Sequence, residues 1–169
     1  MRRNDAIPRN VREVGRFLDG TSIERRETMD VKDLMRRPVV CARVHDSMSI
    51  VEALMTAHGL RHLPVVDAAG SIVGVVSHRD VLAASLSTVA DLTSPERSTF
   101  SDTVQVFEIM RPAPVTISPH ASAASAGKIM LERRLGCVPV VDEHNKVVGI
   151  VTESDFVRFA LGLLGEPRS

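Results

Sequence analysis

The sequence contains no tryptophan and no tyrosine, and its 169 residues include only five phenylalanines. A planar ligand would therefore have to be held by aliphatic side chains and backbone rather than by an aromatic ring. Cysteine is equally scarce. Cys41 and Cys137 lie in apolar, strand-like stretches without CxxC spacing, which argues against a disulfide framework and a structural zinc site. We expect both to be buried thiols, and we expect no bound metal.

Signals of several other protein classes are missing too. No apolar run reaches the roughly 18 to 20 residues of a membrane span, and the amino terminus lacks the apolar core of a signal peptide, so we expect a cytoplasmic protein with no membrane partner. Lys plus Arg is 21 and Asp plus Glu is 21. This balance provides no broad positive field, and we expect no nucleic-acid partner. The motifs GxxxxGK[ST], GxSxG, GxGxxG and HExxH are absent, so we predict neither an enzyme nor a catalytic cofactor.

The sequence does contain two copies of one segment. Shifted by 75 residues, 31–82 aligns with 106–157 without a gap. Far more positions are identical than the roughly three expected of unrelated segments. The identical pairs include Met35/Met110, Arg36/Arg111, His45/His120, Pro64/Pro139, Asp67/Asp142, Gly74/Gly149 and Asp80/Asp155.

Each copy is predicted to fold as a βαββα unit. Apolar stretches at 38–42 and 114–117 indicate a first strand, and apolar residues at i, i+3 and i+4 in 51–55 and 126–130 predict a helix with one buried face. The sequences LPVVD and IVGVVS, matched by VPVVD and VVGIVT, flank a polar turn and predict a β-hairpin. A second helix closes each copy.

The helix starts carry capping signals. Ser49 and Glu52 form a capping-box pattern in the first copy, whereas the second copy has Ala124 and Gly127 there, so we expect its helix to begin less firmly. The closing helices begin with an S/T-x-x-D pattern, Ser77 with Asp80 and Thr152 with Asp155. Found once, this pattern is primarily a helix cap. Its repetition within a family motif favours ligand binding.

The predicted fold class is α/β (α+β), with two βαββα repeats related by a pseudo-two-fold axis. Each repeat is too short to be stable alone, so we expect the two to share one core. The predicted divisions are an N-terminal extension (1–30) with a short amphipathic helix, repeat 1 (31–85), a connection (86–105), repeat 2 (106–160) and a C-terminal tail (161–169).

Three motifs, each present twice at one offset, carry a resemblance. They are VKDLM and VFEIM, RHLPVVD and GCVPVVD, and GVVSHRD and GIVTESD. Over residues 31–160 the chain resembles a tandem pair of cystathionine β-synthase-type (CBS) domains, a Bateman module. The resemblance implies a cleft between the repeats with up to two sites for AMP, ADP, ATP, NAD or S-adenosylmethionine, with AMP as the first expectation. It also implies a homodimer, for which the apolar C-terminal helix is the expected seam.

Carried over by position, Asp80 and Asp155 would accept hydrogen bonds from ribose hydroxyls, and Ser77 and Thr152 would donate to phosphate. A carboxylate suits a vicinal diol because it only accepts, and a helix N-terminus attracts anions. Gly74 and Gly149 would let a ligand or a neighbouring backbone approach their strands. The full expected nucleotide-binding set is Val39, Val40, Arg61, His62, Leu63, Pro64, Ser77, His78, Arg79, Asp80, Val115, Gly136, Cys137, Val138, Pro139, Thr152, Ser154 and Asp155.

Two function hypotheses remain open. The first is a nucleotide-sensing regulatory module that transmits its bound state through a dimer to an unidentified effector protein. The alternative is a ligand-independent interaction or scaffold module with empty clefts. Under the first, His78 and Arg79 should favour polyphosphates at one site, while Glu153 and Ser154 should favour a monophosphate or an uncharged tail at the other.

Overall fold

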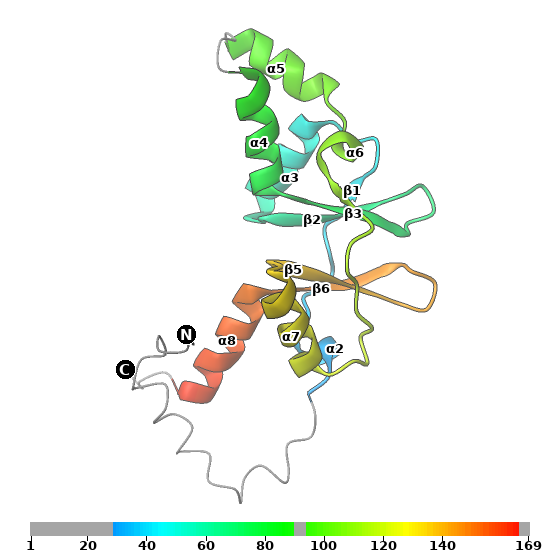
Figure 1. The fold of residues 1–169 in the computed structure, drawn as a ribbon, viewed down its shortest axis with the longest axis vertical. Coiled ribbons are helices and arrows are strands. Elements are labelled where there is room, and N and C mark those ends of the chain that lie inside the picture. Colours follow the sequence, from blue (N-terminus) through cyan, green and yellow to red (C-terminus); the bar gives the residue numbers. More distant parts are fainter. Residues whose placement is uncertain (1–28, 90–93, 166–169) are drawn as a thin grey trace, which may run out of the picture.

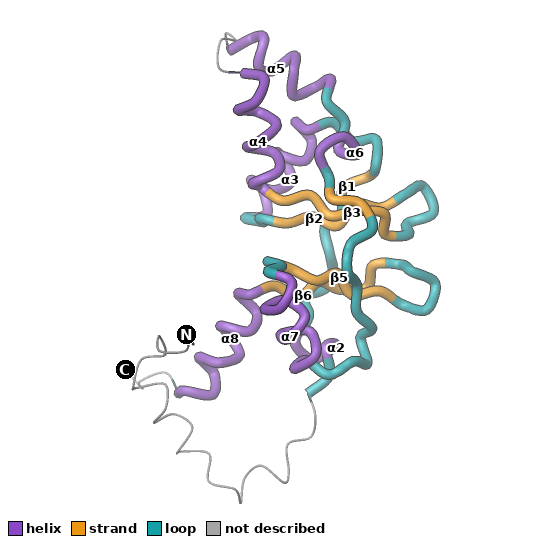
Figure 2. Tube along the Cα trace, in the orientation of Figure 1, coloured by secondary structure: helices purple, strands orange, loops and turns teal. Residues whose placement is uncertain are grey.

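The computed structural model describes residues 29–89 and 94–165 (Figure 1). The amphipathic helix expected within 1–30 lies outside the described residues. The two repeats stack with their sheets facing each other in the middle of the molecule, and their longer helices cover the outer sides (Figures 1 and 2). The prediction of a mixed α/β fold built from two repeats is confirmed.

The elements of the two repeats correspond closely. Repeat 1 contributes β1 (Ala42–Arg43), α3 (Met48–His58), β2 (His62–Val66), β3 (Ile72–Ser77) and α4 (His78–Val89). Repeat 2 contributes α7 (Ala123–Arg133), β5 (Cys137–Val141), β6 (Val147–Thr152) and α8 (Glu153–Leu164). The remaining elements are α2 (Val31–Leu34), α5 (Ser94–Thr103), α6 (Val106–Ile109) and β4 (Arg111–Pro112).

The two hairpins are nearly identical. In β2–β3 the antiparallel register runs from His62 opposite Ser77 to Val66 opposite Ile72, with a bulge at its end. The β5–β6 hairpin repeats this register and bulge at positions 75 residues later. Asp67 and Asp142 close the turns by accepting a hydrogen bond from a backbone N–H four residues on, at 2.9 Å in each case.

The first strands are much shorter than predicted. In repeat 1 only Ala42–Arg43 pairs, in parallel with β2, and in repeat 2 the pairing is a single bridge between Ile117 and Val140. Prolines explain part of the difference, because Pro38 and Pro114 have no backbone N–H to donate to a ladder.

The opening segment of each repeat packs on the other repeat. Val106 of α6 is fully buried in the hydrophobic cluster of repeat 1, and Val31 of α2 is fully buried in the cluster of repeat 2. β4 adds an antiparallel strand to β3, and Arg36 forms the matching bridge with Ile150. The described residues therefore form two hydrophobic clusters, each completed by the other repeat, and the expected single shared core is wrong.

Gly74 and Gly149 leave room for the opening segment of the other repeat to pack on their strands. A Cβ on Gly74 would collide with Sδ of Met110, and a Cβ on Gly149 would collide with Sδ of Met35. A methionine side chain from the other repeat therefore approaches each strand closely, and at Gly74 the backbone carbonyl of Arg111 does so as well, as expected from the sequence.

The predicted difference between the helix starts is also wrong. The N-caps are Ser47 for α3 and Ser122 for α7, and their hydroxyls accept from the backbone N–H of Ile50 at 3.4 Å and of Ser125 at 3.1 Å. These two serines are equivalent positions, so both helices begin with the same kind of cap. Ser49, the predicted cap, lies inside its helix.

Candidate functional site

The two closing motifs cap their own helices in the same way. In repeat 1, Oδ2 of Asp80 accepts from the backbone N–H of Ser77 at 2.9 Å and from its hydroxyl at 2.5 Å. In repeat 2, Oδ2 of Asp155 accepts from the backbone N–H of Thr152 at 2.8 Å and from its hydroxyl at 2.6 Å. Each carboxylate therefore has one oxygen engaged in the helix start and turns Oδ1 toward the opposite repeat.

An arginine from the opposite repeat reaches each Oδ1. Arg36 donates from Nε to Asp155 at 2.7 Å, and Arg111 donates from Nε and Nη2 to Asp80 at 3.4 Å. Sequence reasoning recorded Arg36 and Arg111 as identical positions but gave them no role. The signal was there, since a cation repeated at the same offset as a repeated carboxylate is a candidate ion pair.

A cavity of about 550 Å³ lies between the repeats at the Asp80 end. This first cavity is within the size range of small-ligand sites. Its wall combines the end of β3 and the start of α4 with the segment after β4 and the start of β5. The lining residues are Arg61, His62, Val75, Ser77, His78, Arg79, Asp80, Leu82, Arg111, Pro114, Val115, Arg134, Leu135, Gly136, Cys137, Pro139 and Glu153.

The first cavity is rich in positive charge. Four arginines line it, against the carboxylates of Asp80 and Glu153. A surplus of guanidinium groups beside a helix N-terminus attracts an anion with several oxygens. The four arginines are Arg61, Arg79, Arg111 and Arg134.

A second cavity of about 450 Å³ occupies the pseudo-equivalent position. Its Arg36, Val40 and Leu60 correspond to Arg111, Val115 and Leu135 of the first cavity. The correspondence stops at the closing motif, because neither Thr152 nor Asp155 lines the second cavity.

The structure brings most, but not all, of the expected binding residues together. The first cavity is lined by Arg61, His62, Ser77, His78, Arg79, Asp80, Val115, Gly136, Cys137 and Pro139. The second cavity is lined by Val39, Val40 and again His62. Leu63, Pro64 and Val138 are buried and line neither cavity, and Thr152, Ser154 and Asp155 lie at the start of α8 outside both.

Three charged residues of the first cavity were not among the expected set. Arg111 and Arg134 come from repeat 2, and Glu153 had been expected beside the phosphates of the other site. Glu153 directly follows β6, which faces the first repeat across the middle of the molecule (Figure 1). Its position in the sequence does not show that Glu153 lies beside the closing motif of the first repeat.

His62 of repeat 1 lies against Gly136 of repeat 2 and lines both cavities. A Cβ on Gly136 would come within 2.8 Å of the His62 ring, so the absence of a side chain at Gly136 makes room for it. Burial lowers the pKa of His62 below 6.5, and the carboxylates of Glu153 and Asp80 oppose the shift only in part. The ring is therefore neutral at pH 7 and can donate one hydrogen bond and accept another.

The cysteines differ in burial. Cys137 is buried as predicted, and burial raises its pKa to about 12. Cys41 is only half-buried, and burial also raises its pKa. Both are thiols at neutral pH and are poor nucleophiles.

The described residues lack both a metal-binding cluster and a helix able to cross a membrane. Within 29–89 and 94–165, no three His, Cys, Asp or Glu side chains gather in an arrangement able to hold a metal ion. In the same part of the chain, none of the helices combines the length and the apolar character that crossing a bilayer requires.

Comparison with known proteins gives a consistent result. The model of the CBS domain family matches twice, over residues 31–87 and 106–162. A CBS domain-containing protein of Dictyostelium discoideum is 28% identical over 134 residues, covering 79% of this chain and 92% of that protein. Inosine-5'-monophosphate dehydrogenase of Mycobacterium tuberculosis is 31% identical over 122 residues, but this chain spans only 20% of its length.

Solved structures share the arrangement of the repeats. The structure of CBSX2 in complex with AMP superposes with a TM-score of 0.68 at 27% identity, covering 80% of this chain and 98% of that one. The CBS domain pair of protein MJ0100, in complex with 5'-methylthioadenosine and S-adenosyl-L-methionine, gives a TM-score of 0.68 at 26% identity with the same coverage.

Proposed function

This chain belongs to the CBS domain family, and we propose that it is a regulatory module that binds an adenosine nucleotide, AMP foremost, in the first cavity. The observation that carries the proposal is the position of Ser77 and Asp80. They lie at a helix start on the cavity wall, with four arginines around the same space. A sugar phosphate needs this combination of an acceptor for its hydroxyls and cations for its phosphate.

The proposed pose follows from the lining. The ribose hydroxyls donate to Oδ1 of Asp80, which receives only 3.4 Å contacts from Arg111. The phosphates lie at the N-terminus of α4 beside His78 and Arg79. The purine packs on Val115 and Pro139, where aliphatic surface replaces the aromatic residues that the sequence lacks.

The structural relatives support an adenosine-type ligand. Both CBSX2 and the MJ0100 pair were crystallised with molecules that contain adenosine. The positive lining of the first cavity adds a preference of its own, since each added phosphate gains charge-assisted hydrogen bonds to arginine. We therefore place ADP and ATP, as well as AMP, above S-adenosylmethionine, whose tail carries a positive sulfonium.

Isothermal titration calorimetry with AMP, ATP, NAD and S-adenosylmethionine tests the proposal. We expect saturable heat with AMP or ATP, and at least tenfold weaker binding in Asp80→Asn, which turns one acceptor oxygen into a donor amide. Lys128→Ala is the control, because Lys128 pairs with Glu132 on the outer helix α7 and lines neither cavity. No heat from any of the four ligands at millimolar concentration rejects the proposal.

We further propose that the module acts as a cytoplasmic homodimer that signals to an effector protein. The outer helices of repeat 2 expose apolar side chains at Leu131, Val157, Leu161 and Leu164. Exposed apolar side chains on two helices that pack together favour a protein–protein contact. Sedimentation with and without AMP tests the coupling. A dimer indifferent to every nucleotide favours the alternative, a ligand-independent scaffold.

A further inference from the structure

We propose that Arg158 closes the second ribose position, so that this chain binds one adenosine nucleotide per subunit, at the Asp80 end only. The inference rests on the proposed function, because it takes the two aspartates as equivalent acceptors for a ribose. It concerns a difference between the Asp80 and Asp155 positions, which are equivalent in the 75-residue repeat.

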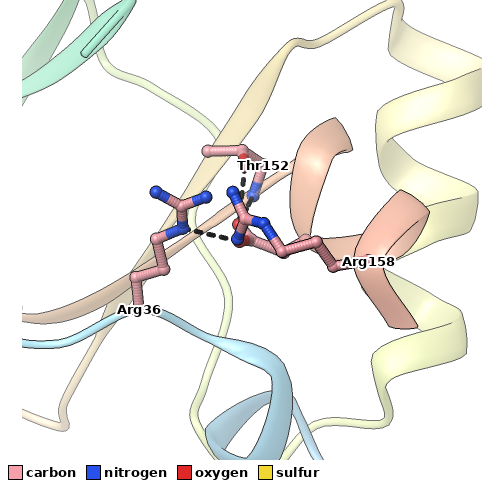
Figure 3. A network of polar contacts seen from close by, with 4 residues as sticks. Arg36, Thr152 and Arg158 are labelled. Atoms are coloured by element: carbon pink, nitrogen blue, oxygen red, sulfur yellow. Dashed lines mark hydrogen bonds and ion pairs between the residues drawn. The ribbon is translucent and has the colours of Figure 1, made fainter. Parts of the chain in front are cut away.

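The carboxylate of Asp155 has no acceptor capacity left. Its Oδ1 accepts from Nε of Arg36 at 2.7 Å and from Nη1 of Arg158 at 2.9 Å (Figure 3). Its Oδ2 accepts the two hydrogen bonds from Thr152. A carboxylate has about four lone-pair positions, and all four are used. The side chain is correspondingly only 3% exposed.

The carboxylate of Asp80 is held less firmly. Among the described residues, the cation placed on its Oδ1 is Arg111, at 3.4 Å, with a side chain that is 73% exposed. The Asp80 side chain is 16% exposed and lines the first cavity. The position equivalent to Arg158 is Ala83, which carries no charge. A ribose hydroxyl has to displace only the two 3.4 Å contacts that this one exposed arginine makes.

The shape of the second cavity agrees with this difference. It contains Arg36 and the aliphatic wall expected for a purine, but it ends before Thr152 and Asp155. Arg36 lines this cavity, and its guanidinium group lies with that of Arg158 against the Asp155 carboxylate (Figure 3). A nucleotide entering there meets a place for its base, but the carboxylate equivalent to Asp80 is already occupied by Arg36 and Arg158.

Arg158 is the residue that distinguishes the two ends. Both ends have the cross-repeat arginine, Arg36 or Arg111, and both have the capping hydroxyl. Among the described residues, only the Asp155 end adds a second arginine, which lies one turn further along the same helix. Two charge-assisted hydrogen bonds outcompete the neutral hydroxyls of a ribose for the same oxygen.

Calorimetric stoichiometry with AMP on the full chain tests the proposal, using Asp80→Asn, Arg158→Ala and the double variant. We expect one AMP per chain in the unaltered protein, two in Arg158→Ala, at least tenfold weaker binding in Asp80→Asn, and one AMP at unaltered affinity beside the weakened site in the double variant. Ala83→Arg should weaken the remaining first-site binding at least tenfold by placing an arginine beside Asp80. Lys128→Ala removes an exposed cation elsewhere and should keep one AMP. A thermal melt of each variant establishes that it is folded.

The outcomes separate the two proposals. Two AMP per chain in the unaltered protein, or one in a folded Arg158→Ala, overturns the closure by Arg158. No AMP on the unaltered chain but one on Arg158→Ala supports the closure and rejects the first cavity as the binding site. No AMP on any folded variant rejects both proposals.

Discussion

Arg36 donates from Nε to Oδ1 of Asp155 at 2.7 Å, although 119 residues of chain separate them. The contact ties the opening segment of repeat 1 to the closing helix of repeat 2. Its counterpart, between Arg111 and Asp80, ties the same elements in the opposite sense at 3.4 Å. The shorter contact belongs to the more buried carboxylate, and this unequal pair leads to the first prediction.

Removing Arg36 should cost more stability than removing Arg111. Asp155 is buried, so the loss of one of its donors in Arg36→Ala should lower the free energy of unfolding by about 1 kcal/mol, reduced from the buried value because Arg36 itself is partly exposed. Arg111→Ala should cost less than about 0.5 kcal/mol, since its pair is long and largely exposed. Urea unfolding of both variants measures the difference. Equal losses would contradict the prediction.

Alanine in place of Gly149 should destabilise the protein. In Gly149→Ala the new Cβ collides with Met35, and forced repacking of this kind costs about 1 to 3 kcal/mol. Met35→Ala in the same chain should recover part of that loss by vacating the space. The control is Gly162→Ala, where nothing lies within 4 Å and a helix former replaces glycine, so it should stabilise α8 by about 0.5 to 1 kcal/mol. Urea unfolding of the four chains decides it, and an unaffected Gly149→Ala would argue against the Met35 contact.

Ser47→Ala and Ser122→Ala should destabilise the protein about equally. Each removes a hydroxyl that accepts from a first-turn N–H, a change typically worth about 1 kcal/mol. Ser49→Ala should cost less, because Ser49 lies inside α3 and does not cap it. Thermal unfolding of the three variants provides the comparison. A larger loss from Ser49→Ala than from Ser47→Ala would restore the capping box expected from the sequence.

The lowered pKa of His62 predicts a dependence of stability on pH. The folded chain binds the His62 proton less readily than the unfolded chain, whose histidine titrates near 6.5. This contribution to stability is therefore fully present above pH 6.5 and is lost as the pH falls below it, because the unfolded state then takes up the proton. Unfolding free energies measured between pH 5 and 7.5 should fall less steeply in His62→Gln than in the unaltered chain. An equally steep fall in both chains would contradict the prediction.

Local patterns predicted the local elements. The hairpins and the helices of both repeats follow from alternating and i, i+3, i+4 apolar spacing, and the turns follow from the polar residues between the paired strands. The 75-residue repeat made each copy a check on the other. Elements stabilised by neighbours in sequence were therefore predictable.

Non-local contacts were not predictable in this way. Val31 and Val106 read as ordinary apolar residues of their own repeats, but each is buried in the cluster of the other. The short first strands depend on which chain segment lies beside them, which apolar spacing does not encode. The same holds for the site: Ser77 and Asp80 were expected from the motif, whereas Arg111, Arg134 and Glu153 reach the first cavity only through the packing of one repeat on the other.

The exchange of opening segments makes the two halves of the chain mutually dependent. Each half contains its own hairpin and helices, but one fully buried valine of its cluster, Val106 or Val31, is attached to the other half. A half-length chain would therefore need a second copy to supply that valine. Substitutions within 31–36 would destabilise repeat 2 rather than the repeat to which these residues belong. The duplicated sequence behaves as an intramolecular counterpart of a domain-swapped dimer.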